Sequence, residues 1–248
     1  MIHTLTAPVQ WRQVDLLSDL HLGPDTPGTF ARLQTHLAET PADAVLLLGD
    51  IFEVWVGDDA RHQPFEAACV AMLKQASQRL SLFFMHGNRD FLVGTDMLAD
   101  CGMTALPDPT LLCAFGERWL LVHGDAQCLS DTAYQLFRNQ VRAPQWQAEL
   151  LAQPLAARQA LACQMREGSR AAQAAQLQAS DLDADVCRAL MDEAGAKTMI
   201  HGHTHRPGEH DLGDGMKRIV LSDWDLDATP PRGDVIRLSD AGLQRLPL

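Results

Sequence analysis

The 248-residue sequence is poor in positive charge and has no long apolar run. Lysine and arginine together number 20 against 32 acidic residues, which gives a formal net charge of −12. Sequence-independent binding to nucleic acid needs a basic surface, so this composition excludes nucleic acid as a partner. A charged ligand must instead meet local positive charge, from a metal ion or from a few arginines.

Membrane-spanning and secreted classes are also disfavoured. No window approaches the roughly 18 consecutive apolar residues that a membrane span needs. The first residues, "MIHTLTAPVQWRQVDLL", contain no basic segment followed by an apolar stretch, so we expect no secretory signal. The sequence therefore predicts a cytoplasmic protein, and it leaves contact with a membrane surface open.

Paired cysteines are missing as well. The six cysteines show neither a CxxC pair nor a regular spacing, which is typical of reduced cytosolic thiols. A disulfide framework and a closed structural zinc site are therefore not indicated. The cysteines are Cys69, Cys101, Cys113, Cys128, Cys163 and Cys187.

Short apolar segments alternate with longer amphipathic ones over residues 14–125. Four segments have the length and apolar character of buried strands, and each ends in polar residues with or near a glycine: "VDLLSD", "AVLLLGD", "LSLFFMHGN" and "RWLLVHGD". Between them, "TFARLQTHLAE" and "FEAACVAMLKQASQRL" carry apolar residues at helical spacing. The alternation predicts a layered α/β fold.

Residues 131–194 differ from the rest of the chain. They are rich in Ala, Gln and Leu, contain no strand candidate, and are interrupted by Pro144 and Pro154, which we expect to end or kink helices. We predict a helical insertion on a single domain that spans residues 1–248. Strand patterns return with "KTMIHGH", "MKRIVLSDW", "GDVIRLS" and "LQRLPL", whose alternation favours an antiparallel finish.

Potential metal ligands follow five of the predicted strands. In open α/β sheets ligands bind beyond the carboxyl ends of strands, so side chains from distant parts of the chain can converge there. One Asp or His after a strand is more often a turn former, a helix cap or a polar loop residue. Five such signals in order are hard to ascribe to chance. The seven candidates are Asp19, His21, Asp50, Asn88, His123, His203 and His205.

Five short motifs resemble, in order, those of the calcineurin-like metallophosphoesterases, a superfamily with two metal ions. They are "SDLHL", "LLGDIFEVW", "HGNRDF", "VHGD" and "IHGHTHRP". Longer stretches, "GDIFEVWVGDD" and "HGDAQCLSDTAYQLFR", are similar to the UDP-2,3-diacylglucosamine pyrophosphatases of lipid A biosynthesis. The resemblance covers residues 16–224. It implies a four-layer α/β/β/α sandwich in which the helical insertion is a lid.

The resemblance also implies how the candidates divide between two ions. Asp19, His21, Asp50 and His205 would hold one ion, and Asp50, Asn88, His123 and His203 the other, with Asp50 bridging. Carboxylate, amide and imidazole ligands suit Mn²⁺, Fe²⁺ or Zn²⁺ better than Mg²⁺, and we expect Mn²⁺. Two such ions clamp a phosphoryl group and activate water, so the predicted reaction is hydrolysis of a phosphate ester or anhydride. His201, which precedes the glycine of its motif, and His210, past Pro207, are expected to have no direct role.

Arg89 occupies the position where many members of the superfamily carry a histidine after the motif's Asn88. Arginine keeps its proton at neutral pH, so it is no general acid, but it neutralises phosphate oxygens with bidentate geometry. This favours a leaving group that needs no proton, such as a phosphate monoester. The predicted substrate is therefore a pyrophosphate, with Asp50, Asn88, Arg89 and His203 as the catalytic residues. A surface ion pair is the alternative for Arg89.

Within the insertion, the resemblance implies further substrate contacts. Asp131 and Ser169 match positions at which members of the family contact the substrate, and so do Asn88, Arg89 and His203. Gln173 and Gln176 stand where an Asn and a Lys occur in the family, which removes one positive contact. The predicted partner is an acylated UDP-sugar lipid at the cytoplasmic face of the inner membrane.

Composition within the insertion is compatible with a lipid partner. Residues 138–170 carry five arginines against two glutamates, a local excess that anionic head groups favour. Its apolar residues either line an acyl pocket or simply pack a helical pair; these are Trp146, Leu150, Leu151, Leu155, Leu161 and Met165. A hydrolase of a soluble nucleotide and a binding scaffold without catalysis are the alternative functions. The oligomeric state is not predicted.

Overall fold

The protein is built on two six-stranded sheets packed face to face. The computed structural model describes the backbone of residues 1–175 and 181–248, and the side chains of residues 1–166 and 181–248. The first sheet contains, in spatial order, β12 (Gly242–Pro247), β11 (Asp234–Ser239), β2 (Gln13–Leu17), β3 (Ala44–Leu48), β4 (Ser81–Met85) and β5 (Met103–Ala105). The second contains β1 (His3–Thr6), β6 (Thr110–Ala114), β7 (Glu117–Leu121), β8 (Thr198–His201), β10 (Met216–Val220) and β9 (Gly208–Gly213).

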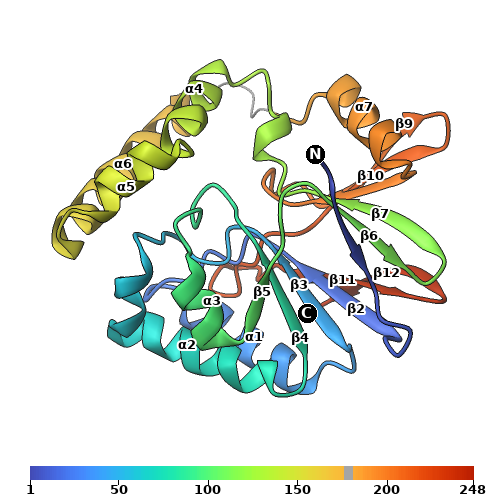
Figure 1. The fold of residues 1–248 in the computed structure, drawn as a ribbon, viewed down its shortest axis with the longest axis horizontal. Helices are drawn as coiled ribbons and strands as arrows, with labels where there is room; N and C mark the ends of the chain where they lie inside the picture. Colours follow the sequence, from blue (N-terminus) through green and yellow to red (C-terminus); the bar gives the residue numbers. More distant parts are fainter. Residues whose placement is uncertain (176–180) are drawn as a thin grey trace.

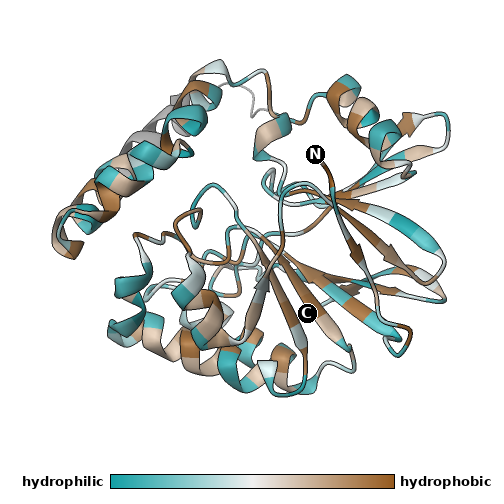
Figure 2. Ribbon diagram, in the orientation of Figure 1, coloured by the Kyte–Doolittle hydropathy of each residue, from teal (hydrophilic) through white to brown (hydrophobic). Residues whose placement is uncertain are grey.

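Helices cover the outer face of each sheet. Helices α1 (Pro27–Glu39), α2 (Pro64–Ser77) and α3 (Thr95–Cys101) bury apolar side chains against the first sheet, and α7 (Ala184–Ala194) does so against the second. A third apolar cluster fills the space between the sheets, where Leu46 of β3 faces Leu121 and Ile200 of the second sheet. The predicted α/β/β/α layering is confirmed, and Figures 1 and 2 show the apolar strands enclosed between the helical layers.

Burial on both faces explains the strand signals that the sequence carries. Strands β2, β3, β4 and β5 pair in parallel, and every residue of β3, "AVLLL", is buried. A parallel strand between two covered faces reads as a continuous apolar run because neither face meets water. Truncating such a side chain, as in Leu46→Ala, is expected to cost about 2–5 kcal/mol of stability.

The finish of the chain departs from the predicted antiparallel arrangement. Strand β10 pairs in parallel with β8, while β9, which the sequence did not reveal, lies at the sheet edge antiparallel to β10. Because β9 turns the chain round between them, β8 and β10 point the same way. Strands β11 and β12 are antiparallel as predicted. The short strands β1, β5 and β6 were also not predicted.

Three helices form an elongated arm beside the sandwich: α4 (Thr132–Val141), α5 (Pro144–Leu151) and α6 (Leu155–Ala175). Pro144 begins α5 and Pro154 directly precedes α6, which confirms that both prolines delimit helices. Helix α7, at the end of the predicted insertion, packs on the second sheet and not with this arm. Figure 1 shows the arm extending past the ends of the strands that face it.

Candidate metal centre

The seven predicted ligands lie where strands of both sheets end. Asp19 and His21 follow β2, Asp50 follows β3, and Asn88 follows β4, all in the first sheet. In the second sheet, His123 follows β7, and the pair after β8 is His203 and His205. Since these strands end at one edge of the sandwich, residues up to 186 positions apart in the sequence are brought together.

One group contains Asp19, His21 and His205. The Nε2 atoms of His21 and His205 are 3.2 Å apart, and His205 Nε2 lies 3.4 Å from Asp19 Oδ1. The other carboxylate oxygen, Asp19 Oδ2, accepts hydrogen bonds from Ser18 Oγ at 2.5 Å and from the backbone nitrogen of His203 at 2.9 Å. Three donor atoms therefore converge on one point, with the carboxylate already fixed from behind.

The second group joins both sheets through Asn88. Its Oδ1 lies 3.0 Å from His123 Nε2 and 2.8 Å from His203 Nδ1. Asp50 Oδ1 is 3.7 Å from the same His123 nitrogen and accepts a hydrogen bond from the backbone of Arg89. His123 Nδ1 lies 2.9 Å from Leu48 O, so Nε2 is the ring nitrogen that faces Asn88 and Asp50.

The two groups share Asp19. Ligand atoms of Asp19, His21 and His205 all lie within 4.8 Å of one another, and so do those of Asp19, Asp50 and His123. Asp19 and Asp50 therefore both lie where the two groups adjoin, and the resemblance implies that Asp50 is the bridging ligand.

Five of the predicted ligands have left-handed backbone conformations. Positive φ values between 47° and 67° occur at Asp19, His21, Asp50, His203 and His205. Only two other residues besides glycine have positive φ in the part of the chain that the structure describes, Phe115 and Asp214. Such residues each cost on the order of 1–3 kcal/mol and cluster at functional sites, where the surrounding structure holds them in place. The backbone is therefore shaped for these side chains.

The buried ionisable groups at this edge of the sandwich shift one another's pKa values. Burial raises the pKa of the Asp50 carboxyl to about 6, and the nearby His123 and His21 only partly offset this. Burial opposes the charged form of His123, yet the carboxylates of Asp50, Asp19 and Asp125 raise its pKa to about 9. Carboxylates and imidazoles are therefore buried together, and their oxygen and nitrogen donors are of the types that bind divalent cations.

Burial and the charge on His123 lower the pKa of His203 to about 4, so this imidazole is neutral at pH 7 and able to act as a ligand. His201 is fully buried beneath the same loop, with Nδ1 2.7 Å from Gly202 O. Burial and the nearby Arg218 lower its pKa to about 3. His210 lies on the edge strand β9, opposite Arg218 and away from the ligand groups.

Several residues at the site were not predicted. Asp90 is buried and accepts backbone hydrogen bonds from Gly87 and Ile51, which ties the loops carrying Asn88 and Asp50 together. Asp223 follows β10 and lies 3.7 Å from His205 Nδ1, a position that the rule of polar residues after strands could have found.

Asp125 and Tyr134 lie beside the predicted ligands of the second sheet. The buried Asp125 accepts hydrogen bonds from Tyr134 Oη at 2.7 Å and Arg138 Nε at 2.8 Å. The Tyr134 ring centre is 6.0 Å from that of His203. Both residues stand in quoted motif segments, but nothing in their spacing marked them.

Arg89 and Arg166 approach the site with unsatisfied donors. The Nε atom of each is buried and has no hydrogen-bond partner among the described residues. The Nη2 atom of Arg166 pairs with Glu53 Oε1 at 2.5 Å. A buried N–H without an acceptor costs about 1–3 kcal/mol, so both arginines are suited to receive phosphate oxygens.

The arginines of the insertion turn toward the sandwich. Arg138 binds Asp125, Arg142 donates to Gly87 O and stacks on Phe91, and Arg158 binds Val56 O and Asp59. These three described arginines hold the arm to the loops after β3, β4 and β7. The apolar residues Trp146, Leu150 and Leu161 pack against the core cluster there.

The predicted substrate residues of the insertion are only partly described. Asp131 caps α4, because its side chain accepts a hydrogen bond from the Tyr134 backbone at 3.0 Å. Ser169 and Gln173 belong to α6, but their side chains lie outside the described ones, and Gln176 lies outside the described residues altogether.

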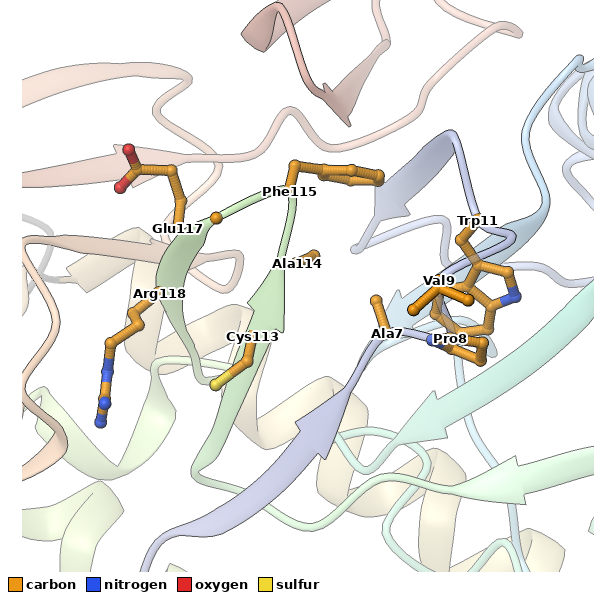
Figure 3. Close-up of a pocket in the computed structure, with 10 residues that line it drawn as sticks. Ala7, Pro8, Val9, Trp11, Cys113, Ala114, Phe115, Glu117 and Arg118 are labelled. Carbon is orange, nitrogen blue, oxygen red and sulfur yellow. The ribbon is translucent and has the colours of Figure 1, made fainter.

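One surface hollow of the sandwich lies away from the candidate metal centre. A cavity of about 530 Å³ opens at the β6–β7 hairpin, at the end of β7 opposite His123. Figure 3 shows Trp11, Val9 and Pro8 on one side of it and Phe115 on the other.

No described helix is long and apolar enough to cross a membrane.

Fold and site together define a class: a metal-dependent phosphoesterase with two adjoining ligand groups at a sheet edge. A family model of the calcineurin-like phosphoesterases matches residues 13–207, and the chain belongs to this family of metal-dependent hydrolases. The predicted resemblance is confirmed.

Curated relatives narrow the family further. The chain is 45% identical over 239 residues to a UDP-2,3-diacylglucosamine hydrolase of Bordetella pertussis, covering 92% of each chain. It is 42% identical over 244 residues to one of Chromobacterium violaceum, covering 95% of this chain and 98% of that one. A third, from Cellvibrio japonicus, is 43% identical over 218 residues, covering 84% and 89%. The chain belongs to the family of these hydrolases.

Proposed function

We propose that the protein hydrolyses the pyrophosphate bond of UDP-2,3-diacylglucosamine in lipid A biosynthesis. The products are UMP and 2,3-diacylglucosamine 1-phosphate. Relatives that match most of this chain at 42–45% identity carry the name of that hydrolase. The observation that carries the proposal is the convergence of Asp, Asn and His donors beside two arginines whose buried Nε atoms lack an acceptor among the described residues.

Two divalent ions, which we propose to be Mn²⁺, would be held by the seven ligands. Asp19, His21, Asp50 and His205 form one set, and Asp50, Asn88, His123 and His203 form the other. When bound, the ions supply Lewis acidity to phosphoryl oxygens and lower the pKa of water. The mixed oxygen and nitrogen donors support Mn²⁺ over Mg²⁺, which prefers oxygen alone.

The protein's own groups orient the reaction. Water attacks the α-phosphorus, and the bond between that phosphorus and the bridging oxygen breaks, so the sugar 1-phosphate leaves with the electron pair. Arg89 neutralises the departing phosphate without giving up its proton. The leaving group needs no proton because its second pKa is about 6. Asn88 and the neutral His203 hold the phosphoryl group in line with this displacement.

The arm is proposed to act as the lid over the acyl chains, within a single domain of residues 1–248. Its helices rest on the loops after β3 and β4, which carry Asp50, Asn88 and Arg89. Asp131, Ser169, Gln173 and Gln176 are proposed to contact the sugar and phosphate groups.

Apolar side chains exposed on the arm and next to it support peripheral binding at the cytoplasmic face of the inner membrane. Leu136 is 73% exposed, and Leu129, Phe137 and Leu151 are each more than a third exposed. Side chains of this kind insert into the boundary between head groups and acyl chains. The acylated substrate would reach the lid from that surface.

The test is UMP release from UDP-2,3-diacylglucosamine in detergent micelles with added Mn²⁺. UDP-N-acetylglucosamine and a chromogenic phosphomonoester serve as soluble controls. We expect fast hydrolysis of the acylated substrate alone, and loss of activity with a chelator that Mn²⁺ restores. Preferential hydrolysis of a soluble substrate would keep the metal chemistry and contradict the lipid assignment.

A further inference from the structure

Glu53 connects a predicted metal ligand to the arm. It stands three residues after Asp50, and its backbone nitrogen donates to Leu22 O at 3.0 Å, which fixes it beside the loop after β2. One carboxylate oxygen, Oε2, lies 3.0 Å from His21 Nδ1. The other, Oε1, lies 2.5 Å from Arg166 Nη2 on α6. A single carboxylate thus bridges an imidazole of the sheet edge and a guanidinium of the arm.

The contact with His21 decides which ring nitrogen is available. Glu53 Oε2 lies within ion-pair distance of Nδ1, and a carboxylate there favours the tautomer with its proton on Nδ1, which leaves the Nε2 lone pair for a metal ion. That atom points at the convergence of Asp19 and His205, 3.2 Å from His205 Nε2. Burial opposes ionisation of Glu53, but His21, Arg89 and Arg166 outweigh it and lower its pKa to about 2, so it is charged at pH 7.

The contact with Arg166 depends on where α6 lies. Arg158, two turns earlier on the same helix, is buried and binds Val56 O and Asp59. Both arginines therefore fasten α6 to the segment that follows Asp50. The Arg166 and Glu53 side chains are 23% and 16% exposed, so their ion pair is shielded from water on most sides.

We propose that Glu53 is a positioning residue for His21, and that Arg166 makes this positioning depend on the docking of α6. Docking of the arm and metal affinity are then coupled. This inference rests on the proposed role of His21 as a metal ligand. Because coupling between two equilibria is reciprocal, bound metal must also hold the arm more firmly in place.

The experiment measures Mn²⁺ binding directly, by isothermal titration calorimetry of the metal-free protein. Glu53→Ala should weaken one of the two Mn²⁺ sites about 10- to 100-fold, as is usual when the partner of a ligating histidine is lost. Glu53→Gln should weaken it less, because the amide oxygen still accepts the Nδ1–H. Arg166→Met should weaken the same site about 5-fold, at the low end of typical coupling.

The double variant separates coupling from two independent effects. Glu53→Ala with Arg166→Met should bind Mn²⁺ no more weakly than Glu53→Ala alone, because Arg166 acts through Glu53. Glu149→Ala, an exposed glutamate of α5, and Arg188→Met, a surface arginine of α7, are matched controls expected to bind like the wild type. Circular dichroism checks that every variant is folded.

Hydrogen exchange supplies the reciprocal readout. Amides of residues 155–166 should exchange more slowly with Mn²⁺ bound, and this protection should vanish in Arg166→Met. Unchanged Mn²⁺ affinity in Glu53→Ala or in Arg166→Met, or additive losses in the double variant, would overturn the inference. Failure of the wild-type protein to bind Mn²⁺ at all would overturn the proposed metal centre itself.

Discussion

The edge of the sandwich and the α4–α6 arm differ in how firmly their side chains are held and in how much apolar surface they expose. At the edge, buried side chains are each fixed by several partners, and five ligands sit on left-handed backbone. The arm exposes apolar side chains such as Leu136 and is joined to the sandwich by arginine side chains and by Leu150. The edge therefore holds its side chains by several contacts each, whereas the arm combines contacts to the sandwich with an exposed apolar surface.

The largest effect should come from Asp50→Asn, which removes a buried charge at the edge while keeping the shape of the side chain. We expect turnover to fall by at least about 10³-fold, because metal ions contribute several kcal/mol to transition-state stabilisation. The assay is UMP release at saturating Mn²⁺, with the exposed Asp240→Asn as control. A fully active variant would disprove the two-metal assignment.

Arg89→Met tests the contribution of the arginine beside the edge. Losing a charge-assisted hydrogen bond of about 1.5–3 kcal/mol should slow hydrolysis about 10- to 100-fold. The backbone bond from Arg89 to Asp50 remains, so Mn²⁺ binding should be unchanged. Arg12→Met, an exposed arginine on the far side, is the matched control. Equal rates for both variants would indicate that Arg89 is only a surface residue.

The sandwich has a buried ion pair of its own, and Asp15→Asn tests it. Asp15 binds Arg237 at 2.7 and 2.8 Å. Burial opposes ionisation, but Arg237, His36 and Thr40 outweigh it and lower the pKa to about 2. Because the folded pKa lies below the unfolded value of 3.8, this stabilisation is complete above pH 4 and disappears as the pH falls through about 2.

The expected size is on the order of 2 kcal/mol at pH 7. Urea unfolding at pH 7, 4 and 3 should show Asp15→Asn less stable than the wild type, with the gap narrowing as acid is added. A gap that stays constant across this range would mean that ionisation of Asp15 does not stabilise the sandwich.

The smallest effect is expected for Arg158→Met, which loosens the arm alone. Amides of α6 should exchange about 10-fold faster, the equivalent of about 1.4 kcal/mol, while those of β3 stay protected. At saturating Mn²⁺, where weaker metal binding through α6 has no effect, the KM for the acylated substrate should rise while kcat stays unchanged. If β3 also exchanged faster, the arm and the sandwich would form one cooperative unit.

Much of the fold could be predicted because parallel strands covered on both faces are uniformly apolar, as in β3. Two of the missed strands, β1 and β9, lack this signal, whereas β6 carries it and was overlooked. Strand β1 is an edge strand with mostly exposed residues, and β9 alternates between exposed and half-buried positions in a segment rich in polar residues. Strand β10 was predicted, but its direction depends on β9, which no local pattern revealed.

The candidate ligands could be predicted because each one follows a strand, and topology then brings strand ends together. Asp223 obeys the same rule and was overlooked. The roles of Glu53, Asp90 and Tyr134 follow from contacts with His21, Ile51 and His203, which are far away in the sequence, and no spacing encodes such contacts. The arginines of the insertion were read as a positive surface, but their partners on the sandwich are visible only in three dimensions.

The left-handed backbone at His205 has an evolutionary consequence. This residue has a φ of 53° and its side chain is 40% exposed, so glycine would relieve the strain at little cost in packing. A population selected for heat resistance alone should therefore accumulate glycine at this position and lose a proposed metal ligand. Each such lineage would gain stability and lose catalytic turnover. His205 would be retained only while the product of the reaction is needed.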